Sequence, residues 1–221
     1  DESSEHGDHA VSYTVPWDIT EQAYVKVVAY RNGSEVASQQ WEYESAGDPG
    51  DPGEPGGPGD DFTNAQPGDL IGGGVYAGID TIGGVDYHIV AGLAESEEYG
   101  LQWKTSRTTT AGTGSASDGL ANTLAMEAAG LADHPAAAHC LAYTGGGHND
   151  WHMPARSQLT LMYNNLRTHA EFATNVSSAN YTWSSTELSS YYAWCRRFSD
   201  GNETNNSRKD YATRRVRPVR R

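Results

Sequence analysis

The sequence of 221 residues predicts an α+β fold for its larger, C-terminal part, residues 62–221. Two observations carry this prediction. Strand-like segments stand at both ends of this part, and three segments with helical spacing lie together between them. Helices grouped in the middle of a domain are typical of α+β proteins, whereas a doubly wound sheet alternates strands and helices along the chain.

The segment that comes first, residues 1–46, predicts a small β-rich module. Residues 24–30 are rich in β-branched and aromatic side chains, which favour a strand. Asn32 and Gly33 then form a strong hairpin signal, and residues 35–43 predict the return strand. Two strands are too few to bury a core. We therefore interpret this segment as the end of a sandwich-like, Ig-like domain whose earlier strands precede residue 1.

Residues 47–61 consist of five consecutive Gly-X-Y triplets, four of which have proline in the third position. Only glycine fits at the axis of three wound polyproline-type chains, so a collagen-like triple helix requires a strict period of three. The alternative is a flexible linker rich in proline and glycine, which seldom keeps this period over five repeats. The pattern favours a short collagen-like stalk and hence a homotrimer, with the flanking domains supplying most of the association energy.

The C-terminal part begins with a predicted hairpin. Residues 75–82 and 85–91 have strand-like composition and flank Gly83 and Gly84, a pair typical of tight turns. Residues 105–117 are rich in Thr, Ser and Gly, which predicts a loop. We thus expect a hairpin followed by a long loop.

Three helices are expected to follow the loop. Ser117 or Asp118 is a suitable N-cap for the first helix. Its apolar positions with helical spacing are Leu120, Leu124, Ala128 and Leu131. Pro135 can open the second helix, which is expected to end at residues 145–147. The third helix is expected after Pro154. Its apolar positions with helical spacing are Leu159, Met162, Tyr163 and Leu166.

The C-terminal tail predicts three short strands, at 181–187, 191–198 and 211–219, with a turn at Asp200 and Gly201. The residues expected to face a core are Trp183, Trp194, Phe198, Val216 and Val219. Between these anchors lie Tyr, Arg, Ser and Asn residues without apolar periodicity. Tyrosines give large rigid contact areas and arginines give forked donors, so this composition favours a recognition surface over a plain solvated hairpin.

The net charge of −14 is unevenly spread along the chain. Residues 1–61 hold fourteen acidic side chains against Lys26 and Arg31, which argues against nucleic-acid binding. Residues 194–221 hold nine Lys or Arg against three acidic side chains. This basic end favours an anionic partner such as a surface polysaccharide, or the acidic part of a neighbouring subunit. No apolar run approaches the roughly twenty residues that cross a bilayer, so we expect no membrane insertion.

Several motifs spaced through residues 70–221 carry a family resemblance. They lie at 134–140, 150–156, 159–165, 181–187, 193–194, 198–201 and 215–220. Together they resemble the C-terminal domain of collagen-like bacterial adhesins and of tailed-phage fibre proteins, and a collagen-like stretch directly before the domain fits that family. The resemblance implies the C-type-lectin-like fold that is shared with formylglycine-generating enzymes. It does not cover residues 1–46.

The resemblance implies a ligand-binding head rather than an enzyme, with a binding face made by the final strands and their loops. Transferred by strand order, that face comprises Tyr191, Tyr192, Arg196, Arg197, Asn202, Asn205, Asn206, Arg208 and Tyr211. Three tryptophans are then expected to anchor the core instead, namely Trp151, Trp183 and Trp194.

Few patterns in the sequence suggest a metal site or a catalytic site. His148, Asp150 and His152 could hold a metal, but the resemblance makes this stretch a structural turn, so we expect no metal. The loop and strand tripeptides of calcium-dependent lectins do not occur. Cys140 and Cys195 leave one disulfide open. Because the sequence has no nucleophile elbow, phosphate loop or reactive cysteine pair, we expect no enzyme activity and no cofactor.

The sequence as a whole predicts a trimeric virion appendage, a phage tail fibre or spike at the virion surface. Its N-terminal module is expected to attach to other virion proteins, and its head to bind a host cell-surface receptor or polysaccharide. Two alternatives stay open. One is a bacterial secreted collagen-like adhesin or surface filament subunit, located outside the cell or on its surface. The other is a structural decoration of a capsid or tail.

Overall fold

A computed structural model describes residues 23–31, 34–43, 60–172 and 181–221 of the chain. The chain divides into two compact units, residues 1–49 and residues 50–221. Residues 47–59, which hold most of the predicted collagen-like stalk, lie outside the described residues. The part of the second unit from residue 60 onward is called the head below.

The first unit contains a two-stranded antiparallel hairpin. Its strands are β1 (Ala23–Arg31) and β2 (Ser34–Tyr43). They pair from Ala23 with Tyr43 to Arg31 with Ser34, and the register shifts between Ala29 and Tyr30. The structure therefore has the two strands that the sequence predicts over residues 24–30 and 35–43, and residues 32–33 between them lie outside the described residues.

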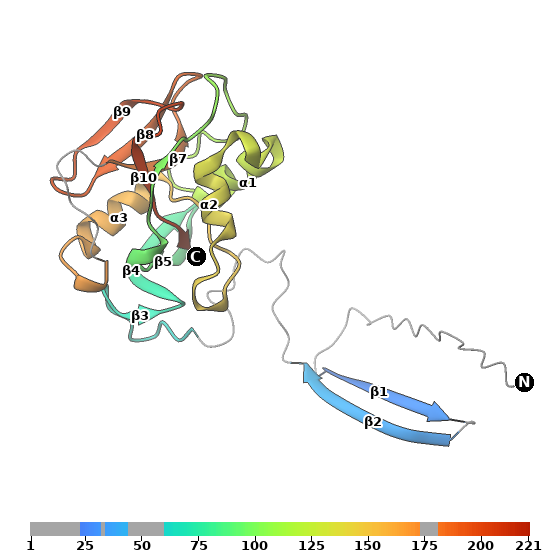
Figure 1. Cartoon of the computed structure of the whole chain (residues 1–221). Helices are drawn as coiled ribbons and strands as arrows, with labels where there is room; N and C mark the ends of the chain where they lie inside the picture. The colour runs from blue at the N-terminus through green and yellow to red at the C-terminus, as the bar shows by residue number, and fades with distance from the viewer. Residues whose placement is uncertain (1–22, 32–33, 44–59, 173–180) are drawn as a thin grey trace, which may run out of the picture. The chain divides into compact units, whose positions relative to one another are not determined.

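The head contains two β-sheets and three α-helices among its described residues (Figure 1). The four-stranded sheet has the order β11-β5-β4-β3, with β3 (Leu70–Ile71), β4 (Gly74–Ile82), β5 (Val85–Gly92) and β11 (Val219–Arg220). The five-stranded sheet has the order β6-β10-β7-β8-β9, with β6 (Glu98–Leu101), β7 (Tyr181–Glu187), β8 (Tyr192–Arg197), β9 (Glu203–Arg208) and β10 (Arg214–Val216). The predicted α+β class is confirmed.

The helices come between the two sets of strands along the chain, as predicted. They are α1 (Gly119–Ala129), α2 (Pro135–Ala142) and α3 (Arg156–Leu166). Four single turns of 3₁₀ helix accompany them in the described part of the head, at Ala94–Ser96, Leu131–Asp133, Gly145–Gly147 and Ala170–Phe172. No helix in the described part of the chain is long and apolar enough to span a membrane.

The hairpin of β4 and β5 turns at Gly83 and Gly84, as predicted. Both glycines have positive φ, 62° and 88°, a conformation that a tight two-residue turn requires and that other residues rarely adopt. The end of the head returns to this hairpin, because Val219 in β11 pairs with Ala91 in β5. Arg220 beside it contacts Asp60, with its Nη1 2.5 Å from Asp60 Oδ2. The first and last described parts of the head therefore lie side by side.

Helix α1 begins where predicted but buries a different face. The Asp118 carboxylate accepts a hydrogen bond from the Ala121 N–H at 2.9 Å, as an N-cap does. Leu124, however, is exposed, and the buried side of the helix includes Asn122 and Thr123. Asn122 bonds both backbone groups of Ser115. The predicted apolar face is therefore wrong, because this helix uses buried polar side chains to hold the neighbouring loop.

The other two helices agree better with prediction. Helix α2 begins at Pro135 and ends at Ala142, three residues before the 3₁₀ turn at Gly145–Gly147. Helix α3 buries Leu159, Met162 and Leu166, as its apolar spacing predicts.

The tail departs from prediction in three respects. An additional strand, β9, follows the Asp200 turn, and the segment predicted as one strand over 211–219 splits into β10 and β11, which belong to different sheets. Trp194, predicted for the core, is only half-buried. Because β8 alternates its side chains between two faces, the neighbours Ala193 and Cys195 take the core positions instead.

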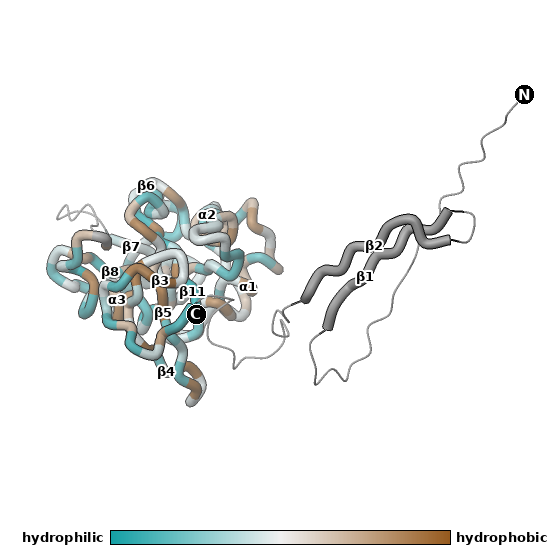
Figure 2. The backbone as a smooth tube through the Cα atoms, turned by 90° about the horizontal axis from the view of Figure 1, so that it is seen from below, coloured by the Kyte–Doolittle hydropathy of each residue, from teal (hydrophilic) through white to brown (hydrophobic). Residues whose placement is uncertain are grey.

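Three clusters of buried hydrophobic residues hold the described part of the head together, and the smallest consists of Tyr76, Val90 and Trp151. Two larger clusters form the main cores. One lies between α3 and the four-stranded sheet and consists of Val75, Ala77, Ile89, Ala91, Leu159, Met162, Leu166, Phe172, Phe198 and Val219. The other lies between the five-stranded sheet and the helices α1 and α2, and it includes Trp103, Met126, Cys140, Trp183, Cys195 and Val216. The tube in Figure 2 alternates between hydrophobic and hydrophilic residues through the head, as expected for elements with one face in a core.

Candidate functional site

The nine residues predicted for a binding face lie in three places. Tyr191, Tyr192, Arg208 and Tyr211 gather where β8 begins and β9 ends. Arg197 and Asn202 lie at the opposite end of these strands, around the turn that joins them. The remaining three lie along the strands, and they are Arg196, Asn205 and Asn206.

The first group forms an exposed aromatic and basic patch. The exposed fractions of Tyr191, Tyr192 and Tyr211 are 50%, 36% and 44%. Tyr192 and Arg208 are directly opposite each other in the ladder of β8 and β9. Two residues outside the prediction join them, Arg107 and Asp210. We call these six residues, Tyr191, Tyr192, Tyr211, Arg107, Arg208 and Asp210, the tyrosine–arginine surface.

The Asp210 carboxylate holds both arginines of this surface. Arg107 Nε lies 3.0 Å from Asp210 Oδ2, and Arg208 Nε and Nη2 lie 3.2 and 3.0 Å from its two oxygens. Arg208 Nη1 also donates to the Tyr211 hydroxyl at 2.5 Å, with its guanidinium carbon 4.1 Å from the centre of that ring. The Arg107 guanidinium lies 5.9 Å from the Tyr191 ring centre. The two guanidinium groups are therefore held in place among the aromatic rings.

A second cluster lies at the opposite end of the strands. Arg197 and Asp200 form a two-pronged ion pair at 2.8 and 2.5 Å, and this hydrogen bonding holds the pKa of Asp200 below its usual range. The Tyr181 hydroxyl donates to Asn202 Oδ1 at 2.9 Å. The Arg197 and Arg214 guanidinium carbons lie 5.1 and 5.2 Å from the Tyr181 ring centre. This cluster mainly shapes the turn.

Arg196 is set apart from both clusters because its side chain packs against α3. Only 12% of that side chain is exposed. Its two terminal nitrogens donate to Gly201 O at 2.7 Å and to Thr160 Oγ1 at 2.8 Å, and one of them also lies 3.4 Å from Glu203 Oε1. Arg196 therefore joins the sheet to α3 and offers little surface to a ligand.

Asn205 and Asn206 are exposed on β9, an edge of the five-stranded sheet. Ala193 pairs with Ser207 and Cys195 with Thr204, so β9 has one more residue than β8 in this interval. Such an extra residue is a β-bulge, which bends an edge strand and makes it a poorer template for pairing with another chain. The two asparagines thus mark the bulge between the two clusters.

A model of one protein family matches this chain. The family is described as the Lcl C-terminal domain, and the match covers residues 92–220, more than half of the chain. The chain belongs to this family. A comparison with curated proteins found no match.

The matched part of the Lcl C-terminal domain includes the whole tyrosine–arginine surface, while β3 and β4 lie outside it. Membership supports the coarser part of the sequence resemblance, namely a C-terminal domain of the adhesin, C-type-lectin-like type. The chain is accordingly a surface or adhesin-like protein.

Arg107 and Asp210 were missed from the sequence because they meet only in the folded head. Arg107 is the one cationic residue in a predicted loop of Thr, Ser and Gly, and its partner Asp210 is 103 residues away along the chain. Such a pairing depends on the tertiary fold. An isolated arginine in an otherwise small and polar loop was the only local signal that could have identified it.

The histidine-rich stretch before α3 has structural partners in this Lcl C-terminal domain. His152 is fully buried and its backbone pairs with that of Val219. The Asp150 carboxylate accepts hydrogen bonds from Arg220 Nε at 2.8 and 3.1 Å, and His148 Nε2 lies 3.8 Å from Asp60 Oδ2. No group of three His, Cys, Asp or Glu side chains that could hold a metal occurs among the described residues.

The two cysteines are free thiols, and both are buried in the core next to α1 and α2. Burial raises the pKa of Cys195 to about 11, although the Ser207 hydroxyl at 2.8 Å from Sγ opposes this shift. Burial also raises the pKa of Cys140. Since the thiolate is the nucleophilic form, both side chains act as small core residues.

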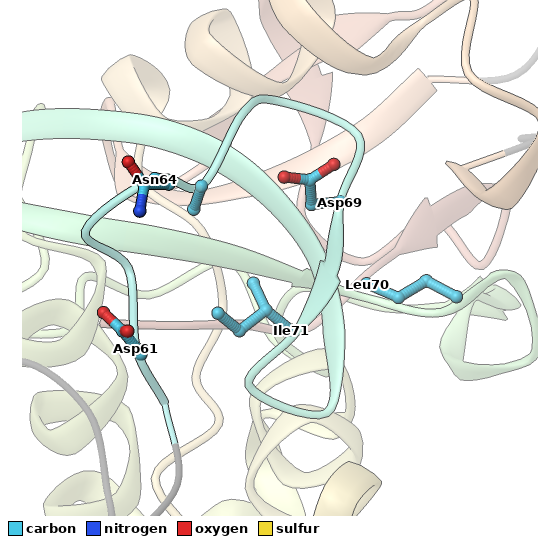
Figure 3. Close-up of a pocket in the computed structure, with 6 residues that line it drawn as sticks. Asp61, Asn64, Asp69, Leu70 and Ile71 are labelled. Carbon is cyan, nitrogen blue, oxygen red and sulfur yellow. The ribbon is translucent and has the colours of Figure 1, made fainter.

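A surface hollow of about 420 Å³ lies at the start of the head, apart from the tyrosine–arginine surface. Its lining residues are Asp61, Asn64, Ala65, Asp69, Leu70 and Ile71 (Figure 3). Two of its acids stabilise local turns, because Asp61 accepts from the Thr63 N–H and Asp69 from the Gln66 N–H. The hollow therefore has an evident structural origin in the loop before β3.

Proposed function

We propose that the head is a ligand-binding module that attaches to a cell-surface receptor or glycan through the tyrosine–arginine surface. The observation that carries this proposal is the gathering of three exposed tyrosines around two arginines fixed by one aspartate. The adhesin-like family of the chain supports it.

The chemistry of this surface favours a glycan with acidic groups. Tyrosine rings offer flat apolar faces for sugar rings at a low cost in side-chain entropy. Arginine offers paired donors that match carboxylate or sulfate oxygens. Two guanidinium groups against the single Asp210 carboxylate leave the surface positively charged, which opposes the chain's overall charge of −14. The expected ligand is therefore an acidic polysaccharide.

The carrier that we propose is a trimeric virion appendage, with residues 47–61 as a collagen-like stalk. The N-terminal module would then attach to other virion proteins. Three heads bind jointly, so each contact can be weak. A bacterial secreted or surface-bound collagen-like adhesin is the second candidate, and the match to the Lcl C-terminal domain favours it. Finding the chain in purified phage particles supports the first carrier, and finding it in a particle-free cell-surface fraction supports the second.

The ligand proposal is tested by measuring binding of the intact chain to dextran sulfate, alginate and unmodified dextran. We expect binding to the two acidic polymers and not to dextran. Tyr192→Ala and Arg208→Gln should each weaken binding about tenfold, as for central aromatic and arginine contacts. Tyr99→Ala is the matched control, because Tyr99 is also exposed but lies on β6. Equal losses from Tyr99→Ala and Tyr192→Ala, or no binding at all, would contradict the proposal.

A further inference from the structure

One residue of the tyrosine–arginine surface, Arg107, is far in sequence from the other five and lies in a loop. Arg107 lies between β6 and α1, where the chain has no helix or strand. Residues 107–109 are exposed, whereas Thr110 and Thr113 are buried. The position of Arg107 therefore depends on the buried groups that hydrogen-bond to Thr110 and Thr113.

Glu187, the last residue of β7, is the main support of this loop. Its two carboxylate oxygens accept from the Thr110 N–H, at 3.2 and 3.1 Å, and one accepts from the Thr113 hydroxyl at 3.2 Å. The Glu187 N–H in turn donates to Thr113 O at 2.8 Å. The Glu187 side chain thus holds the Thr110 N–H and lies within reach of the Thr113 hydroxyl, which also donates to Thr110 O at 2.7 Å.

Lys209 completes the support from the other side of the surface. Its side chain is fully buried, with Nζ paired to Glu187 Oε1 and donating to Thr108 O at 2.7 Å. Its backbone N–H donates to Tyr191 O at 3.1 Å. Lys209 also stands between Arg208 and Asp210 in the chain. It therefore connects the loop of Arg107 to the strands that carry the tyrosines.

A second set of buried bonds holds Thr110. Lys104 Nζ lies 2.8 Å from Thr110 Oγ1, which lies 2.9 Å from His134 Nε2. His134 Nδ1 is 2.9 Å from the carbonyl of Gly130, so this nitrogen carries the proton and Nε2 accepts from Thr110. The loop is thus attached to α1's C-terminal turn as well as to the sheet.

A buried ion pair is seldom the most stable way to fill a core, because apolar side chains of similar volume often serve as well or better. What the Glu187–Lys209 pair provides is a defined geometry for the groups bonded to it. We infer that Glu187 and Lys209 are positioning residues for ligand binding, and that they act by holding Arg107 beside Asp210 and Tyr191. This inference rests on the proposed function of the tyrosine–arginine surface.

The test combines Glu187→Gln with Arg107→Ala and measures binding to dextran sulfate. Glu187→Gln should weaken binding about tenfold, yet it should weaken it little further once Arg107 is alanine. Such non-additivity is the mark of two residues that act through one contact. Glu203→Gln is the matched control, because Glu203 in the same sheet also pairs with two arginines, Arg156 and Arg196, away from the loop. Additive losses, or equal losses from Glu203→Gln, would overturn the inference.

Amide hydrogen exchange separates this inference from the proposed function. In Glu187→Gln, residues 105–113 should exchange faster while α3 is unchanged, and unchanged exchange in the loop would overturn the inference whatever the binding result. Faster loop exchange in a protein whose wild type binds no polysaccharide would instead overturn the proposed function. Thr113→Val removes the contact with Glu187 together with a bond to the Thr110 carbonyl inside the loop, and it unpairs no charge. It therefore tests whether the position of the loop matters for binding if Glu187→Gln does not fold.

Discussion

Single residues in the head show how burial and pairing determine the state of a charged group. His152 is fully buried, and Nε2 of its ring has no hydrogen-bond partner. Burial lowers the pKa of His152 to about 4, against an opposing contribution from the carbonyl of Asp150. The side chain is therefore neutral in the folded head at neutral pH, while in the unfolded chain it titrates near its ordinary value of about 6.5.

The first prediction concerns stability in acid. Because the unfolded chain binds a proton more readily at His152, the stabilising contribution is complete above about pH 6.5 and declines as the pH falls toward 4. Between pH 7 and 5 we expect a loss of about 2 kcal/mol in the free energy of unfolding. Urea unfolding at several pH values measures it. His152→Leu should remove most of this pH dependence of the free energy of unfolding. A smaller part should remain because burial also lowers the pKa of His134.

The second prediction concerns Trp194, whose ring supports a cation. The Arg156 guanidinium carbon lies 3.5 Å from the ring centre, and its nitrogens contact Glu203 at 3.2 and 2.7 Å. A lysine cannot reproduce both the stacking and the two-pronged pair. Arg156→Lys should lower the free energy of unfolding by about 1 kcal/mol, since the site is partly exposed. Arg167→Lys is the control and should change it by less than about 0.5 kcal/mol. An unchanged free energy of unfolding in Arg156→Lys would contradict the stabilising role given to the contacts of Arg156 with Trp194 and Glu203.

At the scale of elements, the predictable parts were those with strong local signals. Gly83 and Gly84 identified the first hairpin of the head, and Asp118 identified the start of α1. Strand β9 was missed because its residues, mostly polar, have low strand propensity and pair only through contact with β8. The face of α1 was mistaken because Asn122 is buried for hydrogen bonding, which apolar spacing cannot reveal.

The cap of α1 gives the third prediction. The Asp118 carboxylate bonds the Ala121 N–H and lies 3.3 Å from Arg221. Asp118→Ala should cost about 1 kcal/mol in the free energy of unfolding, the usual loss for an N-cap. Asp118→Asn keeps an acceptor oxygen and should cost less than half as much. Thermal unfolding of the two variants measures these losses of stability. Equal losses would show that the negative charge next to Arg221, and not the N-cap hydrogen bond, accounts for most of the contribution of Asp118.

For the molecule as a whole, the sequence predicted the head and its class but not how the residues proposed to bind a ligand are distributed in space. The nine predicted residues follow one stretch of chain, whereas the structure separates them into two clusters, a bulge and Arg196, which packs against α3. Arg107 was added to the tyrosine–arginine surface only because the structure shows its contact with Asp210. Residues from one stretch can be listed from sequence, but which of them meet depends on tertiary pairing.

The fourth prediction concerns assembly. If residues 47–61 form a triple helix, the intact chain should be a trimer in light scattering at low concentration. Replacing this segment with a Gly/Ser linker of equal length should shift the mass toward the monomer and weaken binding to a dextran sulfate surface more than binding in solution, because joint attachment is lost. A monomeric mass for both proteins would remove the stalk from the proposal.

The Asp60–Arg220 contact has a mechanical consequence. The chain enters the head at Asp60, and Arg220 connects this point to Asp150 and, through β11, to β5. A target held at the tyrosine–arginine surface while the preceding chain is anchored elsewhere would pull on the head at Asp60. Arg220→Gln should lower the unfolding force in single-molecule pulling from that end, and an unchanged force would show that the load follows another route. Through the Asp60–Arg220 contact, we expect tension along the chain to be shared between the loop before β3 and strand β5.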